Sequence, residues 1–124
     1  MSQALRKAEA VAPATDAQAL DALCATLAAS AAQLDRDAEF PHANLALLRD
    51  AGLLGLATAR RFGGGEADRA KLREVIGAVA QGEPSTALLL AMQYINLRRL
   101  QRNATAPRPL LERVLRESVS DGAL

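Results

Sequence analysis

Apolar residues recur with a helical period in five segments of the 124-residue chain. Side chains three and four positions apart lie on the same face of a helix, so each segment predicts one helix. The predicted apolar stripes comprise Leu20, Leu23, Cys24, Leu27, Ala31 and Leu34; Leu45 and Leu48, with Leu47 beside them; Leu72, Val75, Ile76 and Val79; the run over residues 87–97; and Leu110, Leu111, Val114, Leu115 and Val119.

The predicted helix starts coincide with short polar residues or prolines. Short polar side chains accept hydrogen bonds from first-turn N–H groups, and proline suits the first turn because it has no N–H to satisfy. The residues suited to open the five helices are, in order, Asp16, Pro41, Asp68, Ser85 or Thr86, and Pro107 or Pro109.

The predicted helix ends coincide with a charged segment and two glycines. Residues 35–37 (Asp-Arg-Asp) interrupt the first stripe. Gly52 and Gly82 follow the second and third stripes, as expected because glycine accepts the left-handed conformation common just beyond a helix. Residues 53–56 (Leu-Leu-Gly-Leu) are an apolar connector that we expect to be buried, and residues 120–122 predict a final turn.

The composition supports an all-α fold. Half of the residues are hydrophobic and only 2% are aromatic. The many alanines and leucines favour helices, whereas strands favour β-branched and aromatic residues. We predict a helical bundle of about five helices, with residues 1–15 as a flexible leader and residues 16–124 as one domain. The fourth helix is apolar nearly all round, which predicts burial on most sides.

The near-neutral charge, with 15 basic and 14 acidic residues, argues against a nucleic-acid partner. For the local group Arg98, Arg99, Arg102 and Arg108 a solvated helix end is favoured over a phosphate-binding patch, because cations stabilise the C-terminal end of a helix dipole. The sequence shows neither a secretory signal nor an apolar run of about 18 residues, so we predict a cytoplasmic protein with no membrane partner.

Candidate catalytic chemistry is sparse. His42 is the single histidine, so no Ser-His-Asp set and no His-Cys metal cluster is predicted, and a surface position is expected for it. Cys24 is the single cysteine and is interpreted as a small buried hydrophobe.

Two further segments are interpreted as structural. A charged loop is predicted for Asp35, Asp37 and Glu39. The run Phe-Gly-Gly-Gly at residues 62–65 lacks the P-loop and dinucleotide-binding spacings and predicts a structural turn.

Several segments resemble, in order, the N-terminal helical domain of acyl-CoA dehydrogenases. Residues 35–41 (D-R-D-A-E-F-P) are similar to the entry to that family's second helix, and residues 47–56 (L-L-R-D-A-G-L-L-G-L) to its L-x-x-A-G-L-L-G helix-turn. Residues 61–64 (R-F-G-G) resemble its Y/F-G-G turn, and residues 83–88 (E-P-S-T-A-L) its A-x-x-D-x-S-T-A-L junction. Residues 110–124 resemble the fifth helix and the x-G-x-L that follows. The resemblance covers about residues 20–124.

This resemblance implies an FAD-dependent oxidoreductase that acts on CH–CH groups of an acyl-CoA-type small molecule. In the family, the helical N-terminal domain precedes a β domain and a second helical domain. FAD lies between the latter two, and a glutamate of the last domain removes the α-proton before the β-carbon gives hydride to the flavin. Residues 16–124 hold no counterpart of either later domain, so the resemblance implies no catalytic residue here and no activity for this part alone.

The resemblance also implies substrate-binding residues. In the family, the helix that corresponds to residues 87–97 lines the acyl-chain cavity, which suggests Leu89, Leu90, Gln93 and Leu97 as pocket residues. Plain core packing is the alternative for the leucines. Gln93 on a buried helix requires a hydrogen-bond partner in either case.

Two classes of function remain open at this stage. A flavoenzyme domain predicts an exposed apolar surface for the other domains, and its partner is a homo-oligomer or a chain that supplies those domains. A non-catalytic helical interaction module predicts a self-contained bundle or a symmetric dimer. A domain of a flavin monooxygenase relative and a small apolar-ligand carrier are further alternatives.

Overall fold

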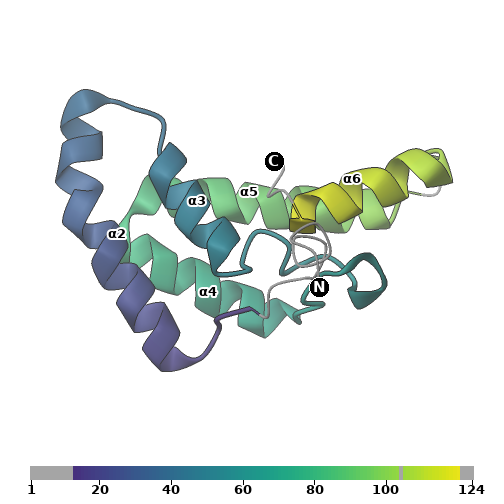
Figure 1. Cartoon of the computed structure of the whole chain (residues 1–124), viewed down its shortest axis with the longest axis horizontal. Coiled ribbons are helices and arrows are strands. Elements are labelled where there is room, and N and C mark those ends of the chain that lie inside the picture. Colours follow the sequence, from purple (N-terminus) through teal and green to yellow (C-terminus); the bar gives the residue numbers. More distant parts are fainter. Residues whose placement is uncertain (1–12, 104, 121–124) are drawn as a thin grey trace, which may run out of the picture.

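The computed structural model describes residues 13–103 and 105–120 of the chain. Within these ranges no residue is in a strand, and the predicted all-α fold is confirmed. Helix α4 packs against both α2 and α5, and α6 packs against α5 and the 3₁₀ turn η1 (Figure 1). The elements are α2 (Ala17–Asp37), α3 (His42–Asp50), η1 (Arg60–Phe62), α4 (Arg69–Gly82), α5 (Pro84–Gln101) and α6 (Arg108–Ser120).

Two apolar clusters form the core. The larger one joins α2, α3, α4 and α5 with the connector that follows α3, and Leu27, Leu48, Leu53, Val75 and Leu90 are among its fully buried members. The smaller one joins η1, α5 and α6 through Phe62, Leu97, Leu111 and Leu115. The inward positions of every predicted stripe are therefore found in the core. Leu47, Leu110 and Val114 are stripe residues that remain exposed.

The predicted helix starts are confirmed for four of the five helices. Asp16 and Asp68 each accept a hydrogen bond of 2.8 Å from the backbone N–H three residues later. Pro41 immediately precedes α3. The Pro107 carbonyl accepts the Leu111 N–H at 3.0 Å, so Pro107 provides the first carbonyl of α6. The start of α5 differs from the prediction and is described with the site.

Helix α3 ends as predicted at Gly52. Gly52 has a φ of 75°, and its N–H donates to the Arg49 carbonyl at 2.9 Å. The Leu53 N–H donates to the Leu48 carbonyl, also at 2.9 Å, which completes the double hydrogen bond of a glycine-capped helix end. This turn directs residues 53–56 into the core, where all four are buried, as predicted.

The prediction of a break at residues 35–37 is wrong. Helix α2 continues through Asp37, and Ala38 is the first residue in the left-handed conformation. The Gln33 side-chain amide donates to the Asp37 carboxylate at 2.7 Å, one helical turn apart. Such pairs between polar or charged side chains one turn apart stabilise a helix on its solvent-facing surface. Asp35 and Asp37 therefore belong to a helix surface and not to a loop.

Gly82 ends α4 as predicted, but for a different physical reason. Its φ is not in the left-handed region, and the next residue is extended. A Cβ at Gly82 would lie 2.6 Å from the Cys24 carbonyl oxygen and 2.9 Å from the Leu27 Cβ. The glycine therefore permits the close approach of α4 to α2, which places the start of α5 beside the end of α2.

Residues 62–65 form the predicted structural turn. Gly63 has a φ of 90°, and the Gly64 N–H donates to the Ala59 carbonyl at 3.1 Å. Of the leader predicted over residues 1–15, the structure describes only residues 13–15, where the Ala14 N–H donates to the Ala51 carbonyl at 3.0 Å. The turn predicted at residues 120–122 lies largely outside the described residues. No helix in the described ranges is long and apolar enough to cross a membrane.

Candidate functional site

Helix α5 carries all four predicted substrate-binding residues, and its inward face buries most of them. Leu90, Gln93 and Leu97 have exposed fractions of 0%, 6% and 4%, and Leu89 is half-buried against the larger apolar cluster. Leu90 belongs to the larger cluster and Leu97 to the smaller one. Among the described residues, no buried side-chain nitrogen or oxygen lacks a hydrogen-bond partner. The assignment of these four residues to an acyl pocket remains a prediction.

The outward face of α5 exposes large apolar side chains, contrary to the expectation of burial on most sides. Leu88, Met92 and Ile95 have exposed fractions of 62%, 51% and 56%. Their spacing of four and three residues places them on one face, which we call the outer stripe of α5. An apolar pattern all round the helix therefore reflects two different faces, one in the core and one open to solvent.

Polar side chains fix α5 against the loop that follows α3. The Tyr94 hydroxyl donates to the Leu53 carbonyl at 2.7 Å, and burial raises the pKa of this phenol, so it stays protonated. The Gln101 amide accepts the Ala59 N–H at 2.9 Å and donates to the Ala57 carbonyl at 3.1 Å. The sequence pattern gave neither residue a role of its own. The requirement that a buried tyrosine hydroxyl finds a partner was the available signal for Tyr94.

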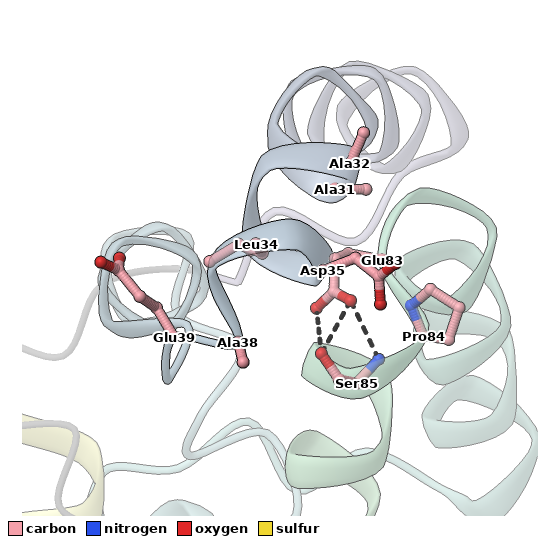
Figure 2. A pocket seen from close by; sticks show the side chains of 9 residues that line it. All are labelled: Ala31, Ala32, Leu34, Asp35, Ala38, Glu39, Glu83, Pro84 and Ser85. Atoms are coloured by element: carbon pink, nitrogen blue, oxygen red, sulfur yellow. Dashed lines mark hydrogen bonds between the residues drawn. The ribbon is translucent and has the colours of Figure 1, made fainter.

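The N-cap of α5 is Glu83, and the prediction of Ser85 or Thr86 is wrong. The Glu83 carboxylate accepts the Ser85 N–H at 3.2 Å and the Ser85 hydroxyl at 2.7 Å (Figure 2). It also accepts the Thr86 N–H at 2.7 Å and the Thr86 hydroxyl. Pro84 occupies the first turn of the helix, where its missing N–H costs nothing. Ser85 and Thr86 are therefore donors to the cap. A proline in the first turn points to the residue before it as the cap, and this signal was missed.

The surroundings of Glu83 stabilise its ionised form. Burial opposes ionisation, but the hydrogen bonds from the side chains and backbone N–H groups of Thr86 and Ser85 outweigh it and lower the pKa of Glu83 below its ordinary value of 4.5. The Thr86 hydroxyl also accepts a hydrogen bond of 3.1 Å from the Asn44 amide. The cap thus links the α4–α5 turn to α3 and fixes the direction of α5.

We expect Glu83→Gln to weaken the folded chain in a pH-dependent way. Because the folded-state pKa is depressed, the carboxylate contributes stability above its unfolded pKa, and this contribution is lost as the pH falls through the folded pKa. The variant should be less stable by about 0.5–2 kcal/mol near neutral pH. Below about pH 4 the difference from the unsubstituted chain should shrink.

Urea unfolding followed by circular dichroism over this pH range measures the difference. Glu117→Gln is the control, because Glu117 forms only an exposed ion pair with Arg113. A stability difference between Glu83→Gln and the unsubstituted chain that stays constant with pH would contradict a cap held by the charge of Glu83.

Three of the hollows in the described part of the chain have linings that do not include the four predicted pocket residues. One lies between the end of α2 and the start of α5 (Figure 2) and is lined by Ala31, Leu34, Asp35, Glu83 and neighbouring residues. The second is a groove between α4 and α5, lined by arginines and apolar residues. The third lies beside Gln101 and Arg102.

Histidine, cysteine and clustered carboxylates are the side chains most often found at reactive or metal-binding sites, and few of them occur in the described residues. These residues contain no cluster of three His, Cys, Asp or Glu side chains suited to a metal ion. His42 is exposed, as expected, with its ring 4.7 Å from that of Phe40. Cys24 is a free, half-buried thiol. The histidine belongs to α3 and the thiol to α2, whereas the four predicted pocket residues belong to α5.

The glycine turn does not fit a flavin phosphate. A Cβ at Gly64 would lie 2.1 Å from the Thr58 carbonyl oxygen, so the space above this glycine is filled by the chain's own backbone. The Gly64 N–H is likewise used by the Ala59 carbonyl. The turn therefore has neither the free N–H at Gly64 nor the open space above it that a flavin phosphate would need.

Comparison with known proteins agrees with this architecture. The family model "Acyl-CoA dehydrogenase, N-terminal domain" matches residues 14–107. No curated protein and no solved structure matches the chain. The matched residues include α2 to α5, with the predicted pocket residues and the outer stripe of α5, and they make up most of the chain. The chain thus belongs to the acyl-CoA dehydrogenase family through its N-terminal domain.

Proposed function

We propose that this domain forms the helical N-terminal part of an FAD-dependent oxidoreductase that acts on CH–CH groups of acyl-CoA-type substrates. Family membership implies FAD in the full enzymes. The flavin, the catalytic glutamate and most cofactor contacts belong to the middle β domain and the C-terminal helical domain. Those domains are supplied on the same or on another polypeptide, and this domain is inactive without them.

The observation that carries the proposal is the outer stripe of α5. Leu88, Met92 and Ile95 expose large apolar side chains along one helix face. Contiguous apolar surface of this kind marks interaction sites, because leaving it in water is unfavourable. The half-buried Leu89 lies next to the stripe, so a domain that covers the stripe would also close over Leu89. Leu90, Gln93 and Leu97 are then the proposed inner wall of the acyl pocket.

Reconstitution tests this proposal. Flavin fluorescence is measured for the chain alone, for a protein carrying the middle and C-terminal domains of the family, and for the mixture. We expect no FAD binding by the chain alone, and FAD binding with acyl-CoA oxidation in the mixture. The double variant Leu88→Glu/Met92→Glu should weaken assembly at least about tenfold, because two charges would enter an apolar interface.

Leu110→Glu is the matched control, since Leu110 is an exposed leucine on α6 and not on α5. Tight FAD binding by the chain alone would contradict the placement of the flavin in other domains. Failure of the mixture to bind FAD or to oxidise an acyl-CoA would reject the oxidoreductase function. Assembly without flavin would favour the non-catalytic interaction module.

A further inference from the structure

The groove between α4 and α5 combines an apolar floor with a basic rim. Its volume is about 330 Å³. The floor residues are Leu72, Ile76, Ala91, Tyr94 and Ile95. The Tyr94 hydroxyl is used by the Leu53 carbonyl, so the floor presents carbon and not a hydrogen-bonding group. All the charged residues that line the groove are arginines, and no acidic residue lines it.

The arginines form two rows, one along each edge of the groove. Arg69 and Arg73 lie one turn apart on α4, and Arg98, Arg99 and Arg102 lie within a little more than one turn on α5. Four of the five are exposed, and Arg98 is half-buried. The three ion pairs found among the described residues involve none of them. The groove therefore offers two rows of cationic groups with no anionic partner in this part of the chain.

The helix dipole explains only one of the two rows. The α5 arginines lie in or just beyond the last turn of their helix, where positive charge is favourable. Arg69 is the first residue of α4, where the dipole disfavours positive charge. The two rows lie at the same end of the groove because α4 and α5 are joined by a tight turn at Glu83. Arg69 therefore lies where the helix dipole disfavours its charge, and contact with an anionic partner would account for a cation at this position.

We propose that this groove docks an acidic amphipathic helix of a partner protein. A helix laid between α4 and α5 would place apolar side chains at positions i, i+3 or i+4 and i+7 on the floor. Glutamate or aspartate beside that stripe would meet the two arginine rows, as flanking charges do along a coiled coil. Arginine suits this contact because its planar guanidinium binds a carboxylate through two parallel hydrogen bonds. The inference does not depend on the proposed flavin function.

A designed peptide probes the groove in the full chain. The probe is a fluorescently labelled helical peptide of about 16 residues, with leucines at i, i+3, i+4 and i+7 flanked by glutamates. The matched control peptide has lysine in place of every glutamate. Fluorescence anisotropy should show binding of the acidic peptide only, and raising the salt to about 0.5 M should weaken it because the contacts are exposed charges.

Charge reversal locates the binding site. Arg73→Glu/Arg99→Glu should weaken binding of the acidic peptide at least about tenfold, since each row loses an attraction and gains a repulsion. Arg113→Glu on α6 reverses a charge away from the groove and should leave binding unchanged. The variants keep Ile95, which belongs both to the floor and to the outer stripe. FAD reconstitution with the same variants tests the proposed function separately.

Three outcomes would overturn the proposal. The first is equal binding of the acidic and basic peptides, which would show a merely apolar contact. The second is acidic-peptide binding that Arg73→Glu/Arg99→Glu does not alter. The third is no peptide binding while dodecanoate binds with the same arginine dependence, which would identify an anionic amphiphile as the occupant.

Discussion

Gly64→Ala is expected to destabilise the folded chain by at least about 3 kcal/mol, which is a large share of the stability of a small domain. The added Cβ would lie 2.1 Å from the Thr58 carbonyl oxygen and 2.5 Å from its carbonyl carbon. Both are backbone atoms, so no side chain can rotate away to make room. The same carbonyl accepts the Glu66 N–H at 2.9 Å, and moving it would disturb the loop that enters α4.

Gly77→Ala is the matched control for this substitution. Gly77 lies inside α4, and a Cβ there would meet nothing within 4 Å. Since glycine costs conformational entropy in a helix, this variant should gain about 0.5–1 kcal/mol. Urea unfolding followed by circular dichroism compares the two. A Gly64→Ala variant as stable as the unsubstituted chain would show that residues 58–66 do not pack as described.

Leu90→Ala and Leu88→Ala should separate the two faces of α5. Leu90 is fully buried in the larger apolar cluster, so removing most of its side chain should cost about 2–5 kcal/mol through lost burial and a remaining cavity. Leu88 is two residues earlier and 62% exposed. Its replacement by alanine should change stability by less than about 0.5 kcal/mol, because both residues favour helices and most of the Leu88 side chain is already exposed to water.

Equilibrium unfolding of the chain alone measures both variants, and the reconstitution assay then completes the comparison. Leu88→Ala should reduce assembly with the flavin-binding domains while leaving the fold of the chain intact. Equal stability losses for the two leucines would mean that the outer stripe is buried, which would remove the basis for docking at that face.

The sequence alone determined most of the fold. Each helical stripe is a local pattern, and its spacing identifies both the helix and its inward face without knowledge of the neighbours. Asp16, Asp68 and Gly52 are equally local signals, since a cap or a left-handed turn involves only residues within one helical turn. Family membership also followed from the sequence, because the order of short motifs is a property of the chain.

Only the tertiary structure decided how α5 divides its surface. Its apolar residues occur all round the helix, so periodicity could not tell Leu90, which is fully buried in the core, from Leu88, which is 62% exposed. The groove arginines come from two helices, and no local pattern places Arg69 near Arg102. Gly82 is required by the close approach of the Cys24 backbone, which is far away in the sequence, and Gly64 by the carbonyl of Thr58 in the same loop. Local periodicity specifies which side chains share a face, whereas the packing of helices decides what, if anything, covers that face.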